Sequence, residues 1–193
     1  MLRRLTVGFA ITIAVGALIL TGLVTFGGPT PPPFNTKIAK HDPAIRASLA
    51  DQPAPETLTA RDGTALAFRR YSGVAGGGAI ILVHGSSGSS RSTHGLAKAL
   101  SAAGANVFAI DVRGHGASGT PGDIAYDGQL DDDIADLARL LDKTLPNERR
   151  LLIGHSSGGG FALRIAGGKY ACAFDGFIAA SPYLNYRSPA NRP

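Results

Sequence analysis

The strongest indication of the fold lies at residues 151–160, which read Leu-Leu-Ile-Gly-His-Ser-Ser-Gly-Gly-Gly. The first three residues form an apolar run, typical of a strand buried on both faces, and the run ends at the pattern Gly-x-Ser-x-Gly. Gly154 and Gly158 flank Ser156 at two residues on either side, as a sharp turn from strand to helix requires, because the backbones approach closely there. Such a turn exposes the Ser156 hydroxyl as a nucleophile. The five-residue pattern alone fits a glycine-rich turn with an incidental serine equally well.

A second predicted strand, residues 79–83, runs directly into the loop His84-Gly85-Ser86-Ser87-Gly88. A loop of glycine and serine that leaves a buried strand can direct a backbone N–H, here that of Ser86, toward the Ser156 region. The N–H of Ser157, at the start of the next helix, would be the second donor. The two loops together therefore predict an oxyanion hole formed by Ser86 and Ser157.

A third motif follows the predicted strand at residues 106–110 and reads Asp111-Val112-Arg113-Gly114-His115-Gly116. With these three motifs in this order, residues 56–186 resemble the α/β-hydrolase family, and more closely its lysophospholipase-like and monoacylglycerol-lipase-like members. The resemblance implies an α/β-hydrolase fold: a mostly parallel sheet with helices on both faces. It also implies a serine hydrolase that attacks a carboxylic ester, of a lipid or another acyl compound, through an acyl-enzyme on Ser156.

The resemblance assigns supporting roles to the other motif residues. His84 and Gly85 would shape the oxyanion loop, and Asp111, Arg113, Gly114 and His115 would brace the loop beyond their strand. His84 and His115 are expected to be structural, and His155 would project from the turn in another direction than Ser156. None of these histidines is therefore expected to be the general base.

The sequence departs from the family after the nucleophile. In the family a triad Asp or Glu and then a His follow on later strand ends. Residues 157–193 contain no His, and their only carboxylate, Asp175, falls at the beginning of a predicted strand at residues 174–180. We expect an α/β-hydrolase domain that is incomplete at its C-terminus and close to inactive as written. The alternative is a non-catalytic, membrane-tethered binding or scaffold module, which would have to manage an exposed strand edge at residues 174–180.

The N-terminus predicts a membrane segment. Residues 5–26 carry no charge and, as a helix, would span about 33 Å, enough to cross a bilayer core. Arg3 and Arg4 precede this run and no charge follows before Lys37, which predicts one transmembrane helix with the N-terminus in the cytoplasm and the domain on the outer side. The alternative is a cleaved signal peptide and a secreted domain, although the run is long for one and no clear small-x-small site ends it.

Three segments follow from these patterns. Residues 1–28 are the expected anchor, residues 29–55 a proline-rich linker, and residues 56–193 the N-terminal part of the α/β-hydrolase domain. Within the domain, the patterns predict a hairpin around an Asp-Gly turn and three helices, the last of them rich in small residues. The hairpin strands are expected at residues 57–60 and 65–71, and the helices at residues 93–103, 130–145 and about 157–166.

Composition limits the partners. The formal net charge is +5, but basic residues occur in scattered pairs, so we expect surface and membrane-proximal charge and no nucleic-acid partner. The five histidines have no Cys or Glu at metal-ligand spacing, and the Asp run at residues 131–133 suits the acidic first turn of a helix better than a metal site. No metal or other cofactor is expected. The single cysteine, Cys172, is predicted to be a buried apolar side chain.

Overall fold

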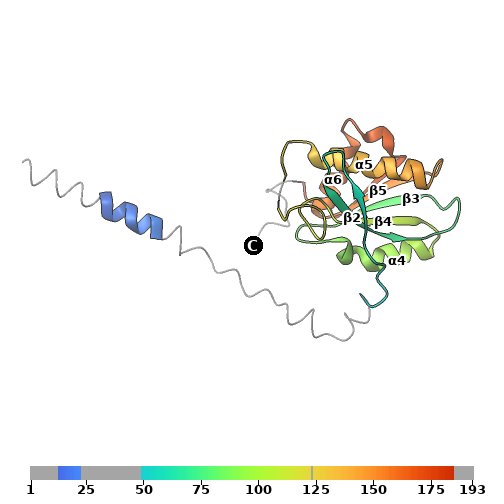
Figure 1. Ribbon diagram of the computed structural model, residues 1–193, viewed down its shortest axis with the longest axis horizontal. Helices are drawn as coiled ribbons and strands as arrows, with labels where there is room; N and C mark the ends of the chain where they lie inside the picture. The colour runs from blue at the N-terminus through green and yellow to red at the C-terminus, as the bar shows by residue number, and fades with distance from the viewer. Residues whose placement is uncertain (1–12, 23–48, 123, 185–193) are drawn as a thin grey trace, which may run out of the picture. The chain divides into compact units, whose positions relative to one another are not determined.

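The computed structural model describes residues 13–22, 49–122 and 124–184 of the chain. The chain divides into two units, residues 1–46 and 47–193, which are considered separately (Figure 1). In the first unit, residues 13–22 are helical. The remainder of the expected anchor, and the expected linker up to residue 48, lie outside the described residues. Across the three described ranges, no helix has both the length and the apolar character needed to cross a bilayer.

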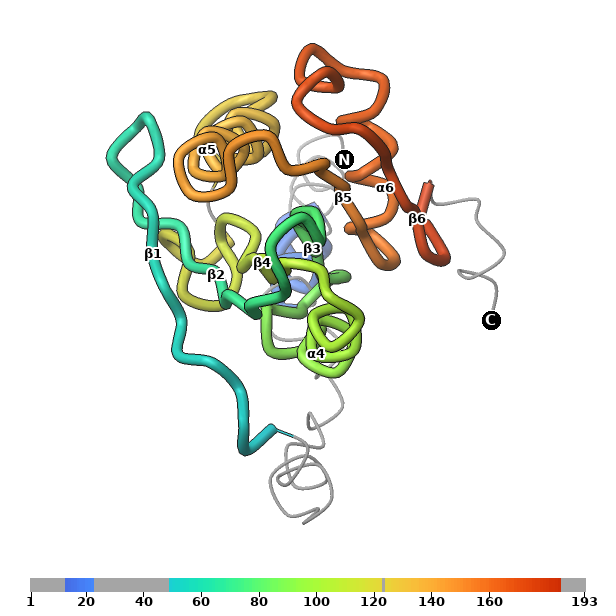
Figure 2. The backbone as a smooth tube through the Cα atoms, turned by 90° about the vertical axis from the view of Figure 1, so that its right-hand side faces the viewer, coloured from blue at the N-terminus to red at the C-terminus, as the bar shows by residue number. Residues whose placement is uncertain are grey.

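The second unit is built on a six-stranded sheet in the order β1-β2-β4-β3-β5-β6 (Figure 2). The first two strands form the predicted hairpin, and β2 also pairs antiparallel with β4, whereas the other neighbours are parallel. The predicted strands are all present, although the last begins at residue 176 rather than 174. Their bounds are β1 Glu56–Thr59, β2 Ala65–Tyr71, β3 Ala79–Val83, β4 Asn106–Ile110, β5 Arg150–His155 and β6 Gly176–Ala180.

Helices cover both faces of the sheet, as predicted. Helix α4 (His94–Ala102) follows the 3-10 turn η1 (Ser90–Thr93) and lies on one face, whereas α5 (Gln129–Thr144) and α6 (Ser157–Ala166) lie on the other (Figure 2). Every residue of β3 and β4 is buried, because central parallel strands are covered on both sides.

Alternate residues of the central strands supply two hydrophobic clusters. Ile81 and Val83 of β3 pack in the cluster that contains Ile134 of α5, and Ile80 and Leu82 pack in the cluster of α4. This alternation is the period of two expected for a strand. The sheet is therefore packed between helices on its two faces. Because β3, β4 and β5 are parallel, their carboxyl ends lie at the same edge of the sheet.

The prediction for Cys172 was wrong. Cys172 lies in a short 3-10 turn, η2 (Ala171–Ala173), and is exposed. The buried apolar side chain in this region is Phe174, which enters the core cluster directly after the turn. Because the turn runs over the surface, Cys172 points away from the core that Phe174 fills.

Candidate active site

Ser156 occupies the junction between β5 and α6 in a strained backbone conformation. Its φ is 55° and its ψ is −119°, which a residue with a Cβ rarely adopts. The backbone is fixed on three sides: the Ser156 N–H donates to the Ala180 carbonyl (3.0 Å), and its carbonyl accepts from the N–H groups of Gly160 (3.1 Å) and Tyr183 (2.9 Å). Such strain persists only where the surrounding structure imposes it.

Close backbone contacts explain the glycines around Ser156. A Cβ on Gly154 would lie 1.9 Å from the Gly158 carbonyl oxygen, and a Cβ on Gly158 would lie 2.5 Å from the His84 carbonyl oxygen. A Cβ on Gly85 would lie 3.2 Å from the Ser156 Cβ. The loop after β3 therefore passes directly against the nucleophile turn.

His84 uses both ring nitrogens within the protein. Its Nε2 lies 3.1 Å from the Val112 backbone N–H, which donates to it, so Nε2 carries no proton. Nδ1 lies 2.7 Å from the Gly85 carbonyl and must donate. Burial lowers the pKa of His84, which favours this neutral form. No lone pair of His84 remains to accept a proton from Ser156.

Asp111 ties the loops after β3 and β4 together. Its Oδ1 accepts from the Ser90 N–H (2.6 Å) and its Oδ2 from the Ala117 N–H (2.8 Å). Ser118 closes the same loop, because its hydroxyl donates to the Asp111 carbonyl (2.6 Å) and accepts from the Ala67 N–H (2.8 Å). Gly114, at a φ of 78°, makes the turn and donates its N–H to the Ser118 carbonyl (2.8 Å).

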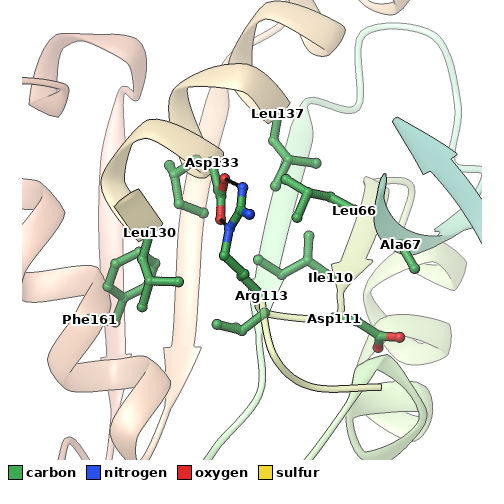
Figure 3. A pocket seen from close by; sticks show the side chains of 11 residues that line it. Leu66, Ala67, Ile110, Asp111, Arg113, Leu130, Asp133, Leu137 and Phe161 are labelled. Atoms are coloured by element: carbon green, nitrogen blue, oxygen red, sulfur yellow. Dashed lines mark hydrogen bonds and ion pairs between the residues drawn. The ribbon is translucent and has the colours of Figure 1, made fainter. Parts of the chain in front are cut away.

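Arg113 anchors that loop to α5. Its guanidinium binds both carboxylate oxygens of Asp133, at 2.8 and 2.6 Å (Figure 3), and also contacts Thr64 Oγ1 (2.8 Å) and Asp62 (2.9 Å). The Arg113 and Asp133 side chains are only 6% and 9% exposed. Burial raises the pKa of Asp133 although Arg113 opposes this, and the Asp133 carboxylate raises the pKa of Arg113.

The acidic run at the start of α5 holds ion pairs and hydrogen bonds. Asp132 accepts from the hydroxyls of Tyr170 (2.5 Å) and Tyr126 (2.9 Å) and pairs with Lys169 (3.0 Å) and Arg61 (3.1 Å). The Tyr170 hydroxyl is the main cause that lowers the pKa of Asp132 to about 2. Within the three described ranges, no three side chains of the metal-binding types form a cluster.

The remaining described histidines lie at different distances from this chemistry. His115 contacts the His84 ring, with 5.3 Å between ring centroids, and its Nδ1 lies 3.3 Å from the Arg113 carbonyl. His155 is exposed beside Ser156, and His94 on α4 is bound to Tyr71 and Asp51. In the part of the chain that the structure describes, no histidine is hydrogen-bonded to the Ser156 hydroxyl.

A pocket of about 390 Å³ opens at the carboxyl ends of the central strands. One wall is polar and includes Ser86 and Ser157, the two predicted oxyanion donors, so the structure brings both residues to one space. The N–H of Ser157 is in the first turn of α6 and has no acceptor within the helix. The pocket is lined by Val83, His84, Gly85, Ser86, Ser87, Val112, His115, Leu130, Ser157, Gly158 and Phe161.

The sequence reasoning missed the apolar wall of this pocket, which includes Val112, Leu130 and Phe161. One signal was present: Phe161 follows Ser157 by four residues, so the two share a helix face. Leu130 is the first residue of the apolar pattern that predicts the helix at residues 130–145, and such a pattern does not distinguish a core position from one beside a pocket.

Comparison with known proteins gives the family. The family model of the serine aminopeptidases, S33, matches residues 76–193. A monoacylglycerol lipase of Mycolicibacterium smegmatis is 30% identical over 109 residues, which are 56% of this chain and 39% of the lipase.

Solved structures agree on the fold. An α/β hydrolase from a Penicillium species superposes with a TM-score of 0.59 at 25% identity, over 67% of this chain and 45% of its own. A Pyrococcus furiosus esterase gives 0.57 at 25% identity, over 71% and 51%. A monoglyceride lipase from Saccharomyces cerevisiae gives 0.56 at 24% identity, over 68% and 45%, and shows the fold alone. The chain thus spans about half the length or less of these relatives. It belongs to the S33 serine aminopeptidase family of α/β hydrolases.

Proposed function

We propose that this chain carries the nucleophile and the oxyanion hole of a serine hydrolase that cleaves a carboxylic ester of the lysophospholipase or lipase type. The observation that carries the proposal is the Ser156 turn. Its backbone is held at a φ of 55° against the Gly85 loop, beside a pocket that Ser86 and Ser157 line. A strained serine between a strand and a helix is the geometry that exposes a nucleophile.

In this mechanism the Ser156 oxygen attacks the ester carbonyl, and its proton passes to a base. The carbonyl oxygen becomes an oxyanion, which the N–H groups of Ser86 and Ser157 stabilise, with one such donor contributing about 3 kcal/mol. The C–O bond then breaks, the alcohol leaves with a proton, and the acyl group remains on Ser156. Water attacks the acyl-enzyme in the second half of the reaction and releases the acid.

The base is the component that this mechanism lacks, because no described histidine is hydrogen-bonded to the Ser156 hydroxyl. The His84 nitrogens are both engaged, and His94 is bound to Tyr71 and Asp51. We therefore propose that the chain acylates slowly unless a base is supplied. Substrate binding and an oxyanion hole alone leave a residual rate roughly 10³–10⁴ times the rate of the uncatalysed reaction in water.

Lipid esters are the proposed substrate class. The relative from Mycolicibacterium smegmatis is named a monoacylglycerol lipase, and Val112, Leu130 and Phe161 give the pocket an apolar side suited to an acyl chain.

We also propose that residues 5–26 anchor the chain in a membrane with the domain on the outer side. Fusions of alkaline phosphatase and of green fluorescent protein after residue 193 would test this: only the phosphatase should be active, and the reverse would place the domain in the cytoplasm.

Imidazole supplied in solution tests the catalytic proposal. Hydrolysis of p-nitrophenyl butyrate by the full chain in mild detergent should rise with imidazole concentration, because imidazole can take the Ser156 proton. The Ser156→Ala variant should show only the background reaction. The control is Ser101→Ala, since the Ser101 hydroxyl lies on α4 and donates to the Lys98 carbonyl of the same helix. Equal rates in the Ser156→Ala variant and the parent would reject the mechanism and favour the non-catalytic, membrane-tethered module.

A further inference from the structure

Two spaces with apolar walls in common adjoin beside the nucleophile turn. The outer one is the 390 Å³ pocket, and the inner one is a void of about 10 Å³ between the sheet and α5 (Figure 3). Three residues line both spaces: Val112, Leu130 and Phe161. A void of this size holds about one water molecule at most, so side chains fill nearly all of the inner space.

The boundary between the two spaces comes from two helices. Leu130 is the second residue of α5, and Phe161 stands one turn after Ser157 on α6. Both side chains are half-buried, and Figure 3 shows them on one wall of the inner void. Beyond them the void is lined by core side chains that include Leu66, Ile134 and Leu137.

The polarity of the outer pocket gives a bound ester one orientation. In the proposed mechanism the N–H groups of Ser86 and Ser157 fix the position of the carbonyl oxygen. His84, His115 and Ser87 line the pocket on the polar side. An acyl chain that starts at this carbonyl is buried from water against the apolar lining residues, of which Val112, Leu130 and Phe161 also reach the inner void. Each methylene buried there should strengthen binding about fourfold.

We propose that Leu130 and Phe161 form the end wall of an acyl-chain site and that Phe161 sets the length of chain accepted. This assignment rests on the proposed ester hydrolysis at Ser156. The chain extends along the apolar wall until it meets the Phe161 ring. Loss of that ring joins the inner void to the pocket, and the Arg113–Asp133 ion pair at the void then sets the next limit.

Straight-chain carboxylates from butanoate to decanoate, each below its micelle concentration, test the proposal by calorimetric titration of the full chain. Affinity should rise about fourfold per methylene and then level off at one chain length. Phe161→Ala should move this break to longer chains, and Phe161→Trp should move it to shorter ones. The matched control is Leu163→Ala on the same helix, where the side chain is 44% exposed, and it should keep the parental break.

A break that stays in place in both Phe161 variants would overturn the assignment, as would an equal shift in Leu163→Ala. The tryptophan variant keeps the test decisive if the alanine variant unfolds. Carboxylate binding needs no Ser156 hydroxyl, so Ser156→Ala should keep the parental profile. A moving break together with failed ester hydrolysis would reject only the catalysis, and active hydrolysis with a fixed break would reject only the acyl site.

Discussion

Two regions at the same edge of the sheet are held by different forces. The first, the α5 brace, consists of Asp132 and Asp133 with their partners Arg61, Arg113 and Tyr170, joined by charged side-chain hydrogen bonds. The second, the elbow region, comprises residues 84–89 and 154–158. It is positioned mainly by backbone contacts, and it contains two non-glycine residues at positive φ, Ser87 and Ser156.

The two regions differ in whether their polar groups already have partners. In the brace, the charged groups of Arg113 and Asp133 are paired and removed from water. In the elbow region the strain is stored in the backbone, and the N–H of Ser157 has no partner within its helix. Donors that are positioned but not yet used are what stabilisation of an oxyanion requires.

The largest expected effect comes from breaking the brace at Arg113. Arg113→Ala leaves the buried Asp133 carboxylate without its cation, which should lower the free energy of unfolding by about 3–5 kcal/mol. Urea unfolding followed by circular dichroism measures this. The double variant Arg113→Met with Asp133→Leu removes both charges and should recover most of the loss. An undiminished loss in the double variant would show that the charge left unpaired is not the cause.

The second effect tests the close approach in the elbow region. Gly158→Ala places a Cβ 2.5 Å from the His84 carbonyl oxygen, and neither backbone can yield easily. We expect a loss of about 1–3 kcal/mol in urea unfolding. Gly95→Ala is the matched control, because its Cβ meets nothing within 4 Å in α4, and it should gain about 0.5–1 kcal/mol. Equal changes in the two variants would contradict the steric explanation.

The third effect returns to the brace and depends on pH. The pKa of Asp132 is lowered to about 2, so its stabilisation is complete above the unfolded value near 4 and is lost as the pH falls through 2. Asp132→Asn should therefore cost about 1–2 kcal/mol at pH 7, with exposed partners such as Lys169 screened by solvent, and less at pH 3. The exposed loop residue Asp127, changed to Asn, is the control. A constant loss at both pH values would assign the effect to packing.

The strands, the helices and the nucleophile turn could be predicted because local patterns determine them. Apolar runs predicted β3, β4 and β5. The spacing of Gly154 and Gly158 predicted the turn, because a Cβ at either position would collide with neighbouring backbone atoms. The brace partners could not be predicted, because Arg61 and Tyr170 reach Asp132 from 71 and 38 positions away. The outward position of Cys172 likewise depends on how the neighbouring Phe174 packs, which a local pattern does not specify.

The smallest effect concerns Ser87, the second strained residue of the elbow region. Ser87→Gly removes the cost of a Cβ at a φ of 56°, about 1 kcal/mol, but gives the unfolded chain more freedom, so we expect a net gain of about 0.5 kcal/mol. The control is Ser72→Gly, because Ser72 is exposed and its φ is not positive. This variant should lose about 0.5–1 kcal/mol of unfolding free energy. Thermal unfolding of both variants measures the difference. A loss in Ser87→Gly as large as in the control would mean that the loop carries no strain and that, of the two, Ser156 alone is held out of its preferred conformation.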